Sequence, residues 1–260
     1  MRYPKLKFNM LRAYFGRPYV IDLEDRPGVI TVYDPGMKAA YIEADENDFK
    51  ATLNIFTTNT TALRAFLWDL GMDWNETTDF ELFTGLYQQA DPDMCKLLFG
   101  DLDFRGFQKY EKHDVQNGES KIVLYNKDAD VMIDEDVYQH IHQYLQALFN
   151  VQIEEEFTDD PYLKDWWVLK DKRDEEIRKL LHKDEANSIQ SLISACVNHP
   201  GFKYNLHEVE EMGVAQFYDS VRRLQVYESS KALMNGAYCG MADLSKVPKE
   251  QFDFMRNINS

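Results

Sequence analysis

The apolar side chains after Asp45 recur every three or four residues, the spacing of one face of an α-helix. An amphipathic helix must bury its apolar face against another element. The chain therefore has to build its core mainly from packed helices, and 260 residues are enough to do so. The stripes are Phe49, Leu53 and Phe56; Leu82, Phe83, Leu86 and Tyr87; Val137, Ile141, Tyr144, Leu145 and Leu148; Ile189, Leu192, Ile193, Cys196 and Val197; and Val214, Phe217, Tyr218, Val221 and Leu224.

Two shorter stretches have β character instead. Near the start, Tyr19–Ile21 and Val29–Tyr33 flank an Arg-Pro-Gly turn signal, which predicts a small N-terminal β element. Further on, 121–125 and the weaker 131–133 predict a central β-hairpin, with a tight-turn signal at 117–118. We therefore predict a mainly helical α+β fold in which both β elements pack on a multi-helix core.

Shifts in composition divide the chain into four segments. We expect an N-terminal β element (1–45), a helical core with the central hairpin (46–150), a charged helical connector (151–187) and a C-terminal helical subdomain (188–260). In the last of these, we expect Gly236 and Gly240 to break the long final helix.

The connector is the most charged part of the chain, and we expect a helix from about Pro161 to His182. Its apolar residues are too sparse for a deeply buried helix, so we interpret it as a solvated connector and a candidate partner-binding arm. Trp166 and Trp167 are adjacent, so on a helix they project about 100° apart and at least one should be exposed or covered by a partner. Aromatic residues among charges are typical of a protein-binding surface.

Charge and cysteine usage exclude several classes of protein. A net charge of −16 argues against general nucleic-acid binding, which needs clusters of Lys and Arg. The three cysteines lie far apart, which fits a reducing cytoplasm rather than a zinc site or a disulfide framework. No apolar run approaches the roughly 20 residues that span a bilayer, and the basic start has no signal-peptide pattern. We expect no membrane association and a location in the cytoplasm.

No catalytic motif stands out. The closest candidate is the carboxylate pair Asp101 and Asp103, which with a histidine would suit a metal-dependent hydrolase, although the ligand ladder of a calcium loop is missing. His140 and His142 are two apart and point to different helix faces, so they do not share a metal, and we expect both to flank the apolar stripe at the surface. We therefore predict no enzymatic activity, no cofactor and no metal site.

Eight strings, in matching order over most of the chain, resemble proteins from the tail-morphogenesis modules of tailed phages and prophages of Gram-positive bacteria, specifically their tail-assembly chaperones. These strings are 11–14, 67–74, 79–83, 97–104, 131–135, 192–198, 201–205 and 217–225. The segment 209–224 also resembles the chaperones' common ending, a short helix followed by a longer amphipathic one.

The resemblance implies a protein that binds the tape-measure protein and tail-tube subunits in the cytoplasm of the bacterial host. It adds Phe217 and Tyr218 to Trp166 and Trp167 as candidate protein-binding residues. A structural tail or baseplate component of the virion is the first alternative, and the hydrolase using Asp101 and Asp103 is the second. The sequence leaves homo-oligomer formation open.

Overall fold

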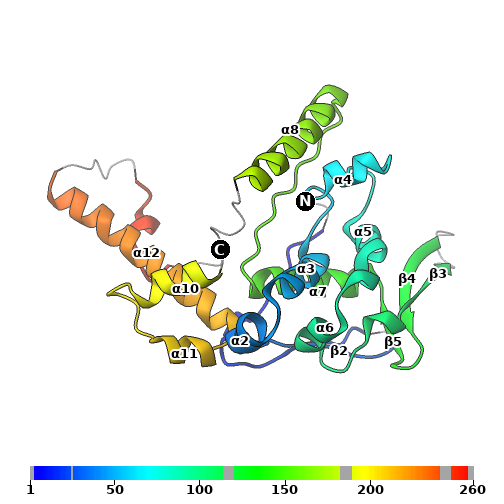
Figure 1. The fold of residues 1–260 in the computed structure, drawn as a ribbon, viewed down its shortest axis with the longest axis horizontal. Coiled ribbons are helices and arrows are strands. Elements are labelled where there is room, and N and C mark those ends of the chain that lie inside the picture. Colours follow the sequence, from blue (N-terminus) through cyan, green and yellow to red (C-terminus); the bar gives the residue numbers. More distant parts are fainter. Residues whose placement is uncertain (1–2, 25, 114–119, 182–188, 241–246, 257–260) are drawn as a thin grey trace.

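The computed structural model describes residues 3–24, 26–113, 120–181, 189–240 and 247–256. Figure 1 shows a body of helices and two small sheets, with α8 rising beside α4 and α12 extending to the left. This mainly helical α+β architecture confirms the predicted fold class.

In chain order the elements are α1 (Met10–Tyr14), β1 (Tyr19–Ile21), β2 (Ile30–Val32), α2 (Gly36–Lys38), the π-helix η1 (Ala39–Glu43), α3 (Glu46–Thr57), α4 (Arg64–Asp69), α5 (Asp79–Leu86), the 3-10 helix η2 (Tyr87–Gln89), α6 (Pro92–Phe99), the 3-10 helix η3 (Phe104–Gly106), β3 (Gln108–His113), β4 (Ser120–Asn126), β5 (Val131–Ile133), α7 (Glu135–Leu148), α8 (Pro161–Leu180), α10 (Ile189–Val197), α11 (Leu206–Glu211), α12 (Val214–Tyr238) and the 3-10 helix η5 (Lys249–Phe252).

The N-terminal β element is an antiparallel pair, β1 with β2, in which Tyr19 is opposite Val32. Its connection passes close to the second sheet. Gly28 has a φ of +79°, and a Cβ there would lie 2.4 Å from the carbonyl oxygen of Asp130. Only glycine fits both the left-handed backbone and this close approach.

The central β element is larger than the predicted hairpin, because β3, β4 and β5 form a three-stranded antiparallel sheet. Both predicted strands are present, as β4 and β5. The additional strand, β3, has the sequence QKYEKH and lies at the edge of the sheet, so it lacks the apolar alternation that marks a half-buried strand. The turn signal at 117–118 falls outside the described residues.

The main hydrophobic core centres on Phe56 of α3. Its ring lies 5.4 Å from that of Phe83, 4.8 Å from Phe99 and 4.9 Å from Phe104, measured between centroids. Aromatic pairs of this geometry contribute about 0.5–1.5 kcal/mol beyond their buried area. This core includes side chains from the segments predicted at 1–45, 46–150 and 188–260, and the four-segment division stays a prediction.

The long helix α12 is attached to the N-terminal part of the chain through Asp34. Its Oδ1 accepts a hydrogen bond from the backbone of Val214 (2.9 Å), and its Oδ2 accepts one from Ala215 (3.0 Å). Gly213 precedes the helix without a side chain to cap it. Asp34 therefore caps from across the fold a helix whose first N–H groups would otherwise lack partners.

The helix α12 also corrects one prediction. It continues through Gly236 to Tyr238, so the expected break at Gly236 is wrong. A glycine inside a helix costs only about 1 kcal/mol relative to alanine, which the rest of a 25-residue helix can absorb. Gly240, with a φ of +69°, lies just beyond the end of the helix, as predicted.

Candidate protein-binding surface

The helix α8 has strong signals at both ends. The side chain of Asp160 accepts a hydrogen bond from the backbone of Tyr162 (2.9 Å), and Pro161 occupies the first helical turn. Arg178 and Lys179 lie in the last turn, where cations interact favourably with the helix dipole. The predicted helix is therefore present, although His182 lies outside the described residues.

The inner face of α8 packs on a small apolar cluster that is separate from the main core. Val168, which is buried, contacts the cluster that Leu67, Trp74 and Leu82 form. Trp167 packs at its edge, and its ring lies 5.2 Å from the guanidinium carbon of Arg64. A cluster of this size anchors the helix only weakly, so polar contacts must supply much of the attachment.

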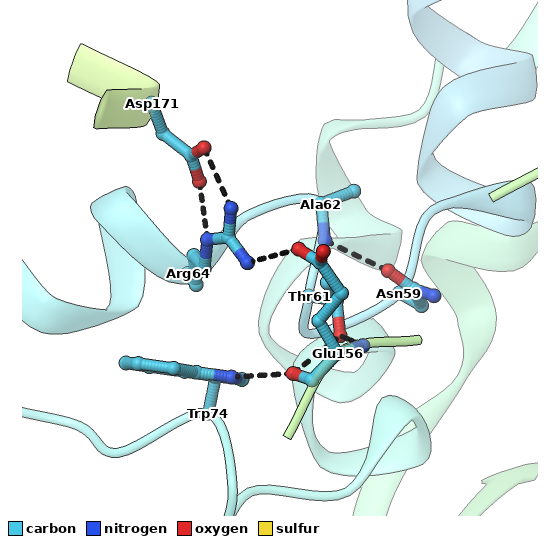
Figure 2. A network of polar contacts seen from close by, with 7 residues as sticks. All are labelled: Asn59, Thr61, Ala62, Arg64, Trp74, Glu156 and Asp171. Atoms are coloured by element: carbon cyan, nitrogen blue, oxygen red, sulfur yellow. Dashed lines mark hydrogen bonds and ion pairs between the residues drawn. The ribbon is translucent and has the colours of Figure 1, made fainter. Parts of the chain in front are cut away.

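Arg64 of α4 provides the centre of those polar contacts (Figure 2). Its side chain is only 5% exposed and grips Asp171 of α8 with two nitrogens, one of them, Nη2, at 2.7 Å. Nη1 donates to Glu156 Oε2 at 2.6 Å. Burial lowers the pKa of Arg64, but the hydrogen bonds to Asp171 and Glu156 more than offset this and leave the pKa above its ordinary value. The guanidinium therefore stays charged and holds α8 to α4 with paired, charge-assisted bonds.

The segment that leads into α8 is held next to Arg64, through Glu156. Trp74 Nε1 donates to the carbonyl oxygen of Glu156 (3.1 Å), and the backbone nitrogen of Glu156 donates to Thr61 Oγ1 (3.2 Å), as Figure 2 shows. Two ion pairs add to this, Lys164 with Asp73 and Lys172 with Asp69. We call the contacts of Arg64 and Glu156, together with these two ion pairs, the Arg64 latch. It fixes which face of α8 points to solvent.

The solvent side of α8 carries an apolar stripe, which we call the outer stripe. Its members and their exposed fractions are Tyr162 86%, Trp166 57%, Leu169 67%, Ile177 37% and Leu180 78%. At 100° per residue these five fall on one face, opposite Val168 and Asp171. The exposed Arg173 has the same phase and interrupts the stripe between Leu169 and Ile177. Large apolar side chains gathered on a solvent-facing surface are typical of a site where another protein binds.

The structure separates the predicted binding residues. Trp166 is on the outer stripe, whereas Trp167 faces the Arg64 latch. Phe217 is fully buried in the main core, so it presents no ring to a partner. Tyr218 is half-buried, and its hydroxyl lies 3.2 Å from that of Tyr41. The stripe at 214–224 faces the core, as apolar stripes usually do. Partner binding by these residues stays a prediction.

Sequence reasoning missed Arg64, because an isolated arginine in a short helix gives no signal that it is buried. It also missed Leu180, which completes the outer stripe. Leu180 lies at the same helical phase as Tyr162, 18 residues earlier, and that spacing was available in the sequence.

Of the two carboxylates proposed for a hydrolase, Asp103 is bound to Arg105. Asp103 accepts hydrogen bonds from the backbone nitrogen (2.9 Å) and side chain (3.0 Å) of Arg105, which hold the pKa of Asp103 below its usual value. Among the described residues, the group spaced to hold a metal is His207, Glu210 and Glu211, away from Asp101. Lys38 Nζ already lies 3.3 Å from one Glu210 oxygen.

The histidine pair is structural. Tyr19 and His140 share a hydrogen bond at 2.6 Å. His142 is buried, so its expected place at the surface is wrong. Its Nδ1 lies 2.9 Å from the carbonyl oxygen of Phe56 and its Nε2 lies 2.9 Å from Gln146 Nε2. Nδ1 therefore donates and Nε2 accepts, which fixes the neutral form, and burial lowers the pKa of His142.

Comparison with known proteins finds a match for the C-terminal part of the chain. Residues 182–259 match the family described as the YomV second domain, and YomV is a phage-associated family. The matched range contains α10, α11, α12 and η5 and begins just after α8. No curated protein and no solved structure matches the chain. None of the described helices combines the length and the apolar character needed to cross a membrane.

Proposed function

We propose that this chain is a phage tail-morphogenesis protein that acts as a tail-assembly chaperone, and that the outer stripe of α8 binds the tape-measure protein. Two observations point to this setting. The C-terminal part matches a phage-associated family, and most of the chain resembles tail-assembly chaperones of phages from Gram-positive hosts. Tail-tube subunits are the second partner that the resemblance implies.

The outer stripe carries the proposal. It extends from Tyr162 to Leu180, which at 1.5 Å per residue is about 27 Å of helix. An elongated helical partner with an apolar face can pack along it over about five turns, as amphipathic helices do in a groove or against another helix. The tape-measure protein is a long apolar helical chain, so it has the shape and chemistry that this stripe fits.

The charges of the chain suit the same role. Six cations and five acids occur along α8, so the helix is almost neutral, whereas the whole chain has a net charge of −16. A net charge this far from zero favours solubility. Because α8 itself is nearly neutral, it adds little net repulsion toward the charged groups of a partner.

Co-expression with fragments of the tape-measure protein from the same phage genome tests the proposal. We expect a fragment that aggregates alone to co-purify as a soluble complex with the chain. The variant Trp166→Glu/Leu169→Glu places charges on the outer stripe and should abolish the complex without unfolding the body. Tyr238→Glu is the matched control, because Tyr238 is 82% exposed on another helix.

Two results would contradict the proposal. One is a fragment that stays insoluble with the wild-type chain, and the other is a complex that the outer-stripe variant retains. Mass spectrometry of purified virions separates the alternative role. A chaperone should be absent from mature particles, whereas a structural tail or baseplate component should be present in them.

A further inference from the structure

A second surface, distant in sequence from α8, combines exposed apolar residues with unpaired positive charge. The short helix α1 presents Leu11 and Phe15 to solvent, 63% and 72% exposed. We call these two residues the α1 knob. The helix packs on α12 through its other face, where Ala13 is buried in the main core. Exposed large apolar side chains on the outer face are typical of a binding surface.

Hollows lie on both sides of the knob, and Leu11 lines both. One, of about 320 Å³, lies between α1, the end of α7 and the start of α12, and we call it the α12 hollow. Apolar side chains such as Met10, Leu148 and Ala215 form much of its wall, and one acid, Asp219, and one cation, Arg222, line it as well. The other, of about 450 Å³, is lined by residues of α1 and its two flanks, namely Asn9, Leu11, Arg12, Phe15 and Arg17.

The charge around the knob is opposite to that of the rest of the chain. The first 21 residues contain five Lys and Arg and none of the 45 acidic residues. Arg12 and Arg17 flank the knob, are exposed, and form no ion pair with another described residue. Arg26, Arg64 and Arg105, by contrast, each bind a carboxylate.

We propose that this surface joins two copies of the chain in a symmetric dimer. The knob supplies apolar side chains and cations, and the neighbouring α12 hollow supplies an apolar wall and the carboxylate of Asp219. Both halves of a complementary pair thus lie next to each other on one patch. That is the condition for a two-fold interface, in which each copy gives its knob to the other's hollow.

Other partners fit this patch less well. A nucleic acid needs an extended track of cations, and the patch offers few cations around an apolar centre. An anionic membrane fits poorly because α1, with five residues, is too short to lie in the interface as an amphipathic anchor. A second copy supplies both the apolar and the acidic contact.

The test is the mass of the full-length protein in solution, measured by sedimentation over a range of concentrations. We expect a closed dimer that dissociates into monomers on dilution. Leu11→Glu/Phe15→Glu should leave only monomer. Arg12→Glu/Arg17→Glu should raise the dimer Kd by about tenfold or more.

Matched controls separate this surface from a general effect of charge. Met255→Glu introduces an acid at another site that is 73% exposed, and Lys203→Glu/Lys249→Glu reverses two other exposed cations; both should leave the dimer unchanged. A wild-type chain that is monomeric at every concentration would overturn the proposal. So would growth into open-ended polymers, a dimer that survives the knob variant, or loss of the dimer in the controls. Binding of the monomer to anionic vesicles through the knob would overturn it too.

Discussion

The two longest helices of the molecule, α8 and α12, are attached in opposite ways. The first half of α12 buries Val214, Phe217 and Val221 in the main core, and its N-terminus is capped by Asp34. The helix α8 buries one valine in a small cluster and is held mostly by the Arg64 latch. A helix anchored by polar contacts keeps its apolar side chains free for a partner, whereas a helix anchored by packing uses them up.

Among the substitutions considered for these two helices, Arg64→Ala should have the largest effect, and it should loosen α8. Removing the guanidinium breaks its charge-assisted hydrogen bonds to Asp171 and Glu156. Because these carboxylates are 29% and 41% exposed, water can solvate them, and the loss should be about 1.5–3 kcal/mol. We expect hydrogen exchange in α8 to become fast while α3 and α7 keep their protection. Arg64→Lys, which keeps the charge but loses the paired grip, should lie in between. Unchanged protection of α8 would show that the small cluster suffices to hold it.

A smaller loss should follow Asp34→Ala at the other helix. The cap loses its hydrogen bonds to Val214 and Ala215, which is worth about 1–2 kcal/mol. Denaturant unfolding should report this as a lower midpoint for the whole body, because the start of α12 is part of the main core. Asp34→Asn keeps one acceptor oxygen and should lose less. A selective loosening of α12 that leaves the body's midpoint unchanged would mean that α12 unfolds on its own.

Lowering the pH should reduce the free energy of unfolding of the main body of the fold, where His140 and His142 lie, rather than loosen α8. Burial lowers the pKa of His142 and of His140 below the ordinary 6.5. Between 6.5 and the lowered folded values, the unfolded chain binds more protons than the folded one, so stability falls as the pH drops through this window. His142→Gln should flatten that fall, whatever its effect at neutral pH. The slope of the unfolding free energy against pH measures it, and an equal slope in the variant would contradict this assignment.

The smallest effect should come from Lys172→Ala. Its partner Asp69 is 61% exposed, and exposed ion pairs are typically worth about 0.5 kcal/mol or less. We expect hydrogen exchange in α8 to rise by less than about threefold, far below the effect of Arg64→Ala. An effect as large as that of Arg64→Ala would mean that the exposed ion pair of Lys172 and Asp69, and not the buried guanidinium, supplies most of the attachment of α8.

Periodicity was enough to predict the helices that bury an apolar stripe, because such a stripe must face the core of a packed fold. It placed α3, α7 and α12, and β-type runs of residues placed the four strands β1, β2, β4 and β5. It could not find β3, whose charged residues form hydrogen bonds at a sheet edge without burying a face. It also could not assign Asp34 to the start of α12, since 180 residues separate Asp34 from Val214 and only the folded chain brings them together.

The candidate protein-binding surface could be predicted only in part, because it too depends on contacts between residues that are far apart in the sequence. Adjacent tryptophans on a charged helix indicate an exposed ring, and Trp166 is exposed. Which of the two points outward depends on Arg64 and Asp171, which are 107 residues apart. Phe217 looked similar in sequence, yet it lies in the core because its helix packs by its apolar stripe.

A photo-crosslinking amino acid at position 166 or at position 167, in chains co-expressed with tape-measure fragments, tests the central claim most directly. The two positions are neighbours in sequence, but one faces solvent and the other faces Arg64. We predict that position 166 crosslinks to the tape-measure fragment and that position 167 crosslinks only within the chain. A crosslink to the fragment from position 167 alone, or from neither position, would contradict the account.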